Sequence, residues 1–315
     1  MSARQDRGHD QLEALIDRRV DRDARSSAES LAALYRRACE QLALARARCY
    51  PAHITDRLER VTTDAHQLIY RRREIGLARL TRVAAVEFPG AVRAHASYVA
   101  VAAAAFMIPT IVIGLLVHRH PELILSVVDS GTAASFESMY SATGGSIGRA
   151  RAASTDWMMF GYYIHHNIGV AFQCFAGGLF AGIGSLFFLV YNGVFSGALG
   201  GYLVERGLSA TFFSFVVTHS AFEVTAIVLS GAAGLRIGHA LVAPGAMRRG
   251  QALIVATRDC AVLLYGVTGM LVVAAAVEAF WSSAGWLPHS AKYGVAAVCW
   301  TSVIAYFTLQ GRREN

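Results

Sequence analysis

An imidazole and a carboxylate stand four residues apart inside a long apolar stretch of this sequence, at His219 and Glu223. On a helix, that spacing places both side chains on one face. At the depth of a lipid bilayer neither group can face the acyl chains, so both must point into protein or into a wet cavity. The pair could relay a proton, contribute to a metal site, or lock two helices together by hydrogen bonds.

The residues around the pair bear on which chemistry is open to it. A metal site normally needs three or four ligands, and nothing nearby completes one; His239 and Asp259 could contribute only if folding brings them close. Hydrolysis would need a nucleophile or a metal-activated water with an oriented base, and no His-Glu-x-x-His motif occurs. We therefore predict no catalytic residue, no metal and no cofactor.

Four further polar residues belong to the predicted intramembrane cluster. Arg236 is a candidate partner for Glu223 or for a lipid phosphate. Glu278 stands late in an apolar segment and is either interfacial or the partner of a buried group. Asn167 is expected to bridge helices, and Asn192 stands where we predict the chain to be interrupted.

Glycines recur every fourth residue at Gly193, Gly197 and Gly201, and Gly178 and Gly182 repeat the spacing. Small residues four apart allow helix backbones to approach closely in a membrane. We expect these glycines to pack helices within the chain, with a homodimer seam as the alternative.

The composition is that of a membrane protein. The chain has 315 residues, of which 54% are hydrophobic and 16% charged, against roughly 25% charged in soluble domains. We predict an all-α polytopic integral membrane protein with about six transmembrane helices, one of them short or broken at Tyr191-Asn192-Gly193. A second discontinuity is predicted at 231–238, and five spans with one re-entrant segment are the alternative count. The predicted spans are 97–117, 163–190, 193–205, 211–234, 261–280 and 293–309, with an extracytoplasmic loop at 118–161.

The N-terminal region differs from the rest. Up to Ala96 there are 18 Arg against 13 Asp and Glu. We predict a disordered tail at 1–9, an amphipathic helical hairpin or small bundle at 10–93, and the transmembrane domain at 94–311. Arginines beside membrane segments indicate a cytoplasmic side and contact with the lipid bilayer, not nucleic acid. Both termini are therefore expected in the cytoplasm, with the chain in the bacterial inner membrane.

Six segments follow one another along the apolar part of the chain. They are Tyr163–Phe172, Phe175–Gly178, Asn192-Gly193, His219–Glu223, Gly231–Gly238 and Val277–Phe280. In this order they resemble the stage II sporulation protein M family of bacterial integral membrane proteins. Two positions depart from that family, which usually has paired asparagines at His166-Asn167 and Pro-His-Gly at Thr218-His219-Ser220. The second departure should leave the helix around His219 more regular.

The resemblance implies a membrane scaffold, because the family's named member brings together cell-wall-degrading partners. We accordingly predict a non-enzymatic scaffold of envelope or cell-wall-remodelling proteins, itself a candidate homodimer. A transporter or channel-like protein centred on His219 and Glu223 is the alternative, and a membrane-embedded hydrolase is a weaker one. A scaffold predicts that both side chains bond to neighbouring helices, a transporter predicts a polar cavity reaching them, and a hydrolase predicts further ligands or a nucleophile.

Overall fold

The structure, a computed structural model, describes residues 24–48, 50–70, 77–141 and 153–311. Every regular element in these ranges is helical, so the chain is all-α as predicted. It divides into two compact units, Met1–Arg79 and Leu80–Asn315. The predicted tail at 1–9 lies outside the described residues.

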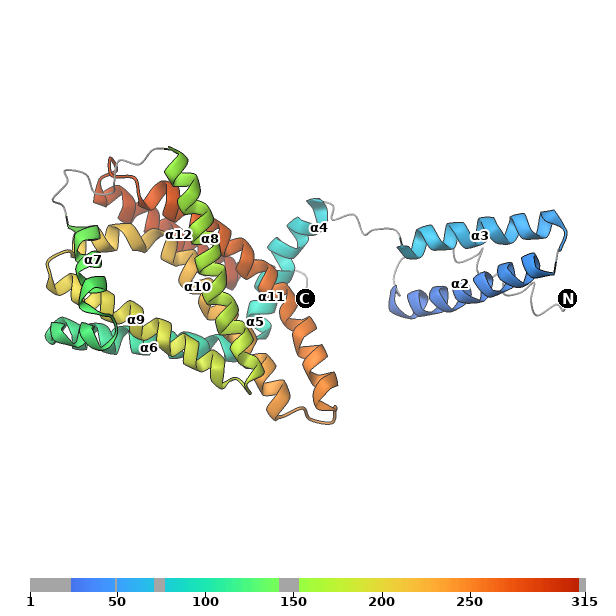
Figure 1. Cartoon of the computed structure of the whole chain (residues 1–315), viewed down its shortest axis with the longest axis horizontal. Coiled ribbons are helices and arrows are strands. Elements are labelled where there is room, and N and C mark those ends of the chain that lie inside the picture. The colour runs from blue at the N-terminus through green and yellow to red at the C-terminus, as the bar shows by residue number, and fades with distance from the viewer. Residues whose placement is uncertain (1–23, 49, 71–76, 142–152, 312–315) are drawn as a thin grey trace. The chain divides into compact units, whose positions relative to one another are not determined.

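In the described part of the first unit, two long helices pack together, α2 (Ala24–Ala47) and α3 (Ala52–Tyr70). They pack side by side as the predicted hairpin (Figure 1). Among the described residues, Ala38, Val61 and Ala65 form a buried cluster against which Leu34 and Tyr35 pack, and Ala45 and Leu58 are buried as well. On the outside, Arg46 pairs with Glu59 across the two helices at 3.0 Å.

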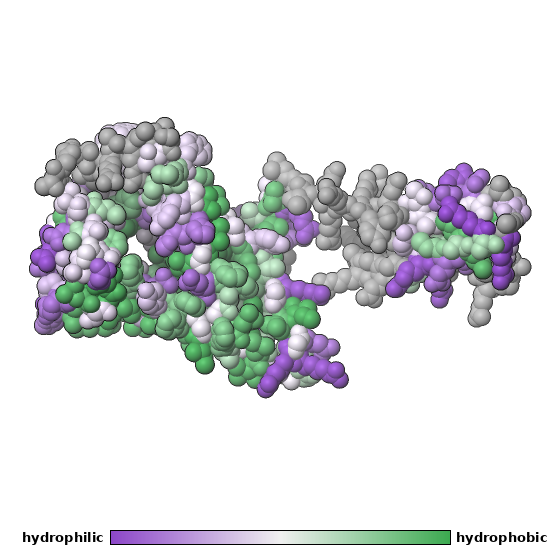
Figure 2. Space-filling view, viewed as in Figure 1, coloured by the Kyte–Doolittle hydropathy of each residue, from purple (hydrophilic) through white to green (hydrophobic). Residues whose placement is uncertain are grey.

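The second unit, here called the membrane unit, holds the long apolar helices. Among the described residues, five helices have the length and composition to cross a bilayer. Large apolar side chains cover much of the visible face of this unit, whereas hydrophilic ones gather over the middle of α8 (Figure 2). The five candidate spans are α6 (Ala96–Arg119), α9 (Ile183–Glu205), α10 (Ser209–Val242), α11 (Arg249–Ala276) continued by the π-helical turn η4 (Val277–Ser282), and α12 (His289–Leu309).

Helix directions bear on the number of crossings. Helices α6 and α9 lie side by side (Figure 1). They run parallel, because residues later in α6 contact residues later in α9. Two parallel spans require a return crossing between them, and α8 (Ala153–Ala176) is the helix long enough to make it among the described residues in between. If α8 makes this return crossing, the chain crosses the membrane six times, once more than the five candidate spans. The contacts between α6 and α9 join Phe106 to Gly193, Thr110 to Gly197, and Gly114 to Gly201.

Helix α8 is missing from the five candidates because polar residues such as His165, His166 and Gln173 dilute its apolar character. It runs parallel to α10, since Ser230 donates to the carbonyl of Ala171 and Gly234 lies against the carbonyls of Cys174 and Phe175. This direction is the one that six crossings require.

Two predicted interruptions are wrong. Helix α9 runs unbroken through Asn192 and Gly193, where the sequence suggested a break and a short third segment. Helix α10 likewise continues through 231–238. The chain instead breaks between α8 and α9, at the short turn η3 (Gly177–Leu179) and at Gly182, whose φ of +84° favours glycine.

The predicted boundary at residue 93 is also wrong, because the membrane unit begins at Leu80. Helix α4 (Leu77–Arg82) leads through the π-helical turn η1 (Val83–Glu87) into α5 (Phe88–Ala94). Phe88 and Val92 are buried in one cluster with Leu263 and Val267 of α11. Burial of these side chains places α5 in the membrane unit.

The predicted loop at 118–161 contains structure of its own. It holds the 3-10 helix η2 (Pro121–Ser126), the helix α7 (Ser130–Tyr140) and the start of α8. Asp129 caps α7 by accepting a hydrogen bond from the backbone N–H of Thr132 at 3.0 Å.

Candidate functional site

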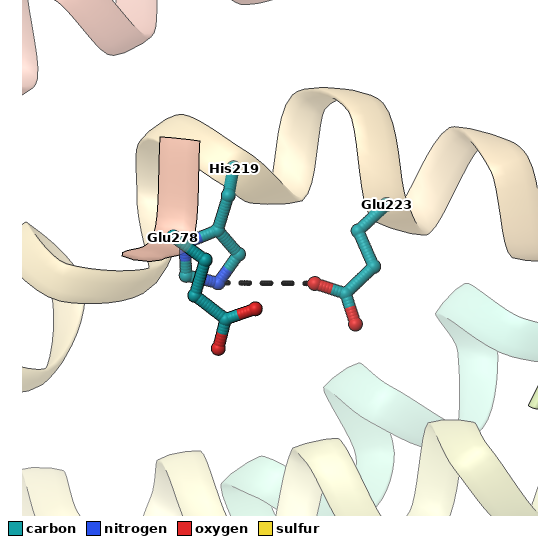
Figure 3. Close-up of side chains that lie close together, drawn as sticks. All are labelled: His219, Glu223 and Glu278. Carbon is teal, nitrogen blue, oxygen red and sulfur yellow. Dashed lines mark ion pairs between the residues drawn. The ribbon is translucent and has the colours of Figure 1, made fainter. Parts of the chain in front are cut away.

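Three ionisable side chains converge inside the membrane unit. His219 and Glu223 project from one face of α10, as their spacing predicts, and Glu278 reaches them from η4 (Figure 3). One ligand atom of each lies within 4.8 Å of the other two. The Nε2 of His219 is 3.8 Å from Oε2 of Glu223, which is too long for a hydrogen bond.

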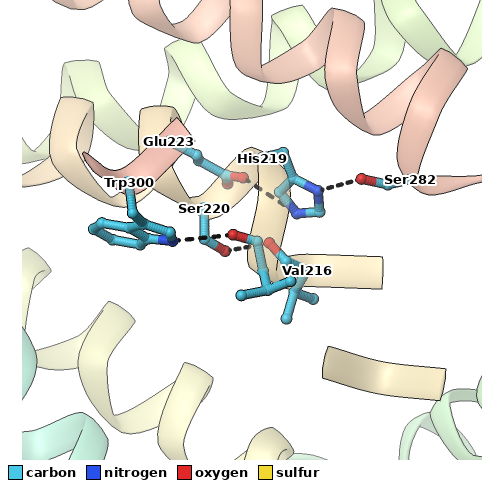
Figure 4. A network of polar contacts seen from close by, with 7 residues as sticks. Val216, His219, Ser220, Glu223, Ser282 and Trp300 are labelled. Atoms are coloured by element: carbon cyan, nitrogen blue, oxygen red, sulfur yellow. Dashed lines mark hydrogen bonds and ion pairs between the residues drawn. The ribbon is translucent and has the colours of Figure 1, made fainter. Parts of the chain in front are cut away.

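The imidazole of His219 is held on its other side. Its Nδ1 lies 3.0 Å from the hydroxyl of Ser282 (Figure 4), and the ring of Phe215 meets it edge-on with centroids 5.4 Å apart. The side chain of His219 is 6% exposed and that of Glu223 is 23% exposed. The pair therefore faces protein, and His219 in particular is turned away from the acyl chains.

A residue that the sequence analysis did not single out supports Ser282. Lys292 of α12 is only 1% exposed, and its Nζ donates to the backbone carbonyl of Ser282 over 2.7 Å. The hydroxyl of Thr218 donates to the carbonyl of Lys292 at 3.3 Å. The sequence does carry a signal for this residue, since a single lysine stands at the start of an apolar segment. Burying its ammonium group costs free energy unless the group is paired or hydrogen-bonded.

The backbone of η4 explains how Glu278 and Ser282 both reach α10. Helix α11 changes to π-helical winding at Val277 and keeps it to Ser282. Such turns are rare and often occur at functional sites, because they shift side chains relative to an α-helix. Trp300 of α12 adds a link on the other side of α10, donating its Nε1–H to the carbonyl of Val217 at 3.1 Å (Figure 4).

Helix α7 places an aromatic hydroxyl near the cluster. The ring of Tyr140 packs edge-on against Phe212 and Phe215 of α10, with centroids 5.4 and 6.0 Å away. Burial raises the pKa of Tyr140, and the charge of Glu278 raises it further. The region between α6 and α8 therefore contributes to the surroundings of the site.

The remaining predicted cluster residues lie elsewhere. Arg236 pairs with Asp259 of α11 at 3.5 Å, so the predicted pairing with Glu223 is wrong. Asn192 lies inside the unbroken α9 and donates to the carbonyl of Phe188 in the same helix at 2.7 Å. Asn167 is buried, and its Nδ2 has no hydrogen-bond partner within the part of the chain that is described.

The predicted glycines lie at close approaches between helices of one chain. Gly193, Gly197 and Gly201 face α6, where an added Cβ would overlap a backbone carbonyl oxygen at each position. Gly178 lies against the backbone of Gly234 in α10, and Gly182 begins α9. These surfaces are occupied within the chain, so they are not available for a homodimer seam.

The cluster offers one nitrogen and two carboxylate groups to a single point. A histidine and carboxylates are common ligands of divalent transition metals, and the same groups could share a proton. The sequence predicts no metal site because no neighbouring residue completes one. Folding brings in Glu278, 55 residues beyond Glu223, as a third candidate ligand.

Two family models match this chain, and each match falls within one of the two structural units. A family model described as stage II sporulation protein M matches residues 102–283, which include His219, Glu223 and Glu278. A model described as a domain of unknown function (DUF8413) matches residues 4–71. Neither a curated protein nor a solved structure matches the chain significantly.

Proposed function

Because this chain belongs to the stage II sporulation protein M family, we propose that it is a non-enzymatic scaffold that assembles proteins of the bacterial envelope. It is a multi-pass membrane protein with two parts of different character. The membrane unit would anchor the assembly, and the α2–α3 hairpin would bind partners in the aqueous phase.

The observation that carries this proposal is that a separate helical unit precedes the membrane unit. Among its described residues the hairpin buries only Ala38, Ala45, Leu58, Val61 and Ala65, while Arg36 and Arg37 are exposed on α2. A small charged hairpin has little interior in which to hold a substrate. It does present a surface that a protein partner can recognise by charge.

The proposed orientation follows from arginines and crossings. Arginines precede α6, and Arg248 and Arg249 stand between α10 and α11. Six crossings put these positions, and both termini, on one side of the membrane. The positive-inside rule favours the cytoplasm, so we place the α2–α3 hairpin there, with the chain in the inner membrane. The proposed homodimer would use a surface other than the glycine-lined ones.

The proposal is tested by neutralising charge on the hairpin. In native membranes, Arg36→Gln with Arg37→Gln should reduce cross-linking to envelope proteins at an unchanged protein level. The matched control is Arg119→Gln with Arg258→Gln, which removes the same charge from two exposed positions of the membrane unit and should keep the cross-links. Equal cross-linking in both variants, or a wild-type protein that cross-links to nothing, would contradict a scaffold.

Transport is the second candidate, and the observation that favours it is the cluster of His219, Glu223 and Glu278 within the membrane unit. Glu223→Gln separates the two functions. A scaffold predicts weaker folding or assembly, because the carboxylate sits between packed helices. A transporter predicts normal protein level and assembly together with lost ion flux in proteoliposomes.

A further inference from the structure

We propose that His219, Glu223 and Glu278 together bind one divalent transition metal ion, with Zn²⁺ as the best match. This inference concerns the membrane unit alone and stands whether or not the α2–α3 hairpin binds partners. The ion would join α10 to η4, two elements that are distant in the sequence.

The first argument is the spacing of the three ligand atoms. Zinc binds nitrogen and oxygen at about 2.0–2.2 Å, so neighbouring ligand atoms of a tetrahedral site lie about 3.3 Å apart. The separation between His219 and Glu223 is 3.8 Å, and no two of the three atoms are more than 4.8 Å apart. Glutamate side chains have three rotatable bonds, so small torsional changes can bring them into contact with an ion.

The second argument is the way His219 is held. Histidine ligands usually donate their other ring N–H to a fixed acceptor, which orients the ring and selects the tautomer. Here the hydroxyl oxygen of Ser282 lies 3.0 Å from Nδ1 and can accept a hydrogen bond from Nδ1–H. Nε2 then carries a lone pair and faces the carboxylate of Glu223, which also offers lone pairs. A cation bound between these two atoms would be coordinated by a lone pair from each.

The support extends one residue further from the site. Ser282 is held through its backbone carbonyl by the buried ammonium of Lys292 at 2.7 Å. These bonds satisfy buried polar groups and at the same time fix the position of Ser282 beside the imidazole. A ligand must keep its direction while an ion binds, and buried partners provide that rigidity.

The third argument is electrostatic. Carboxylates within a bilayer are costly unless they are paired or coordinate a cation. Two of them, Glu223 and Glu278, share one site with an imidazole nitrogen. A divalent ion would offset the negative charge that these carboxylates carry when they are ionised.

The donor set also selects the class of metal. Mg²⁺ and Ca²⁺ prefer all-oxygen surroundings, whereas imidazole favours zinc and its transition-metal neighbours. Three protein ligands would leave the fourth position of a zinc ion to water.

The test uses the full chain, purified in detergent and stripped with a chelator. Isothermal titration with ZnCl₂ should show one site per chain. Glu278→Gln should weaken binding by at least about tenfold, the scale set by changes around metal ligands. Glu205→Gln removes a carboxylate outside the cluster and should leave zinc binding unchanged. MgCl₂ should show no binding at the same concentrations.

Further variants keep the inference testable if Glu278→Gln folds poorly. Glu223→Gln removes a second ligand, and Ser282→Ala leaves all three ligands but releases the imidazole, so both should also weaken zinc binding. Circular dichroism and gel filtration would show that each variant is folded. X-ray absorption of the zinc-loaded wild type should show nitrogen and oxygen neighbours without sulfur. The inference is overturned if the wild type binds no zinc, or if folded Glu278→Gln and Glu223→Gln bind it as tightly.

Discussion

Gly197 of α9 lies so close to the carbonyl oxygen of Thr110 in α6 that a Cβ on the glycine would overlap it. The same relationship recurs one turn before and one turn after, at Gly193 and Gly201. Two parallel spans are thus in backbone contact, and their direction implies that α8 crosses between them.

This contact predicts the effect of one methyl group. Gly197→Ala should destabilise the membrane unit by about 1–3 kcal/mol, because a backbone carbonyl cannot move as a side chain can. Thermal unfolding in detergent would show the loss. Gly200→Ala is the control, since its Cβ would meet the ring of Phe212 at an ordinary 3.5 Å, and it should be neutral or stabilising by up to about 1 kcal/mol. Equal losses at the two positions would argue against close packing of α6 on α9.

A second prediction concerns the side of the membrane on which each loop lies. In a chain whose native cysteines are replaced by alanine, single cysteines would be placed at Glu122, Met247 and Trp286, all exposed. With six crossings and both termini inside, a membrane-impermeant maleimide should label the cysteines at 122 and 286 in spheroplasts. It should reach the one at 247 only after lysis. Five crossings would instead put the cysteines at 247 and 286 on the wrong sides.

A third prediction addresses the pairing of Arg236. Its guanidinium lies 3.5 Å from Asp259, and both side chains are partly exposed. A double-mutant cycle with Arg236→Gln and Asp259→Asn should give a coupling of only about 0.2–1 kcal/mol. The same cycle with Glu223→Gln should be additive, because Arg236 does not contact Glu223. Strong coupling to Glu223 in unfolding measurements would restore the pairing that the sequence suggested.

The fourth prediction tests the α2–α3 hairpin. Val61→Ala removes two buried methyl groups from a core of few residues and should destabilise the hairpin by about 1–3 kcal/mol. Amide hydrogen exchange of the full chain, followed by mass spectrometry, should accelerate in α2 and α3 while α10 keeps its protection. Thr63→Ala, at an exposed position, should leave exchange unchanged. Acceleration throughout the membrane unit would contradict two independent units.

Local properties of the sequence were sufficient to predict several features. Apolar segments long enough to cross a bilayer indicate α6, α10, α11 and α12, because an exposed peptide backbone in lipid must form helices. The four-residue spacing of His219 and Glu223 is enough to put both on one helix face. Glycines spaced by four likewise indicate close helix packing without naming the partner.

Position along the chain could not decide which glycines break a helix. Gly193 and Gly182 look alike in sequence, yet Gly193 lies inside α9 against α6, whereas Gly182 has a positive φ at the start of that helix. The difference depends on a helix more than seventy residues earlier in the chain. Local composition does not contain it.

Tertiary structure alone assembled the site. Glu278, Ser282 and Lys292 follow His219 by 59 to 73 residues, and no periodicity connects them to it. The packing of α10 against η4 and α12 brings them together, and the π-helical turn sets the direction of Glu278 and Ser282. Hydrophobicity indicates most of the segments that enter the membrane, α8 excepted. The side chains that meet there are determined by how those helices pack, because each helix has several apolar faces on which another could lie.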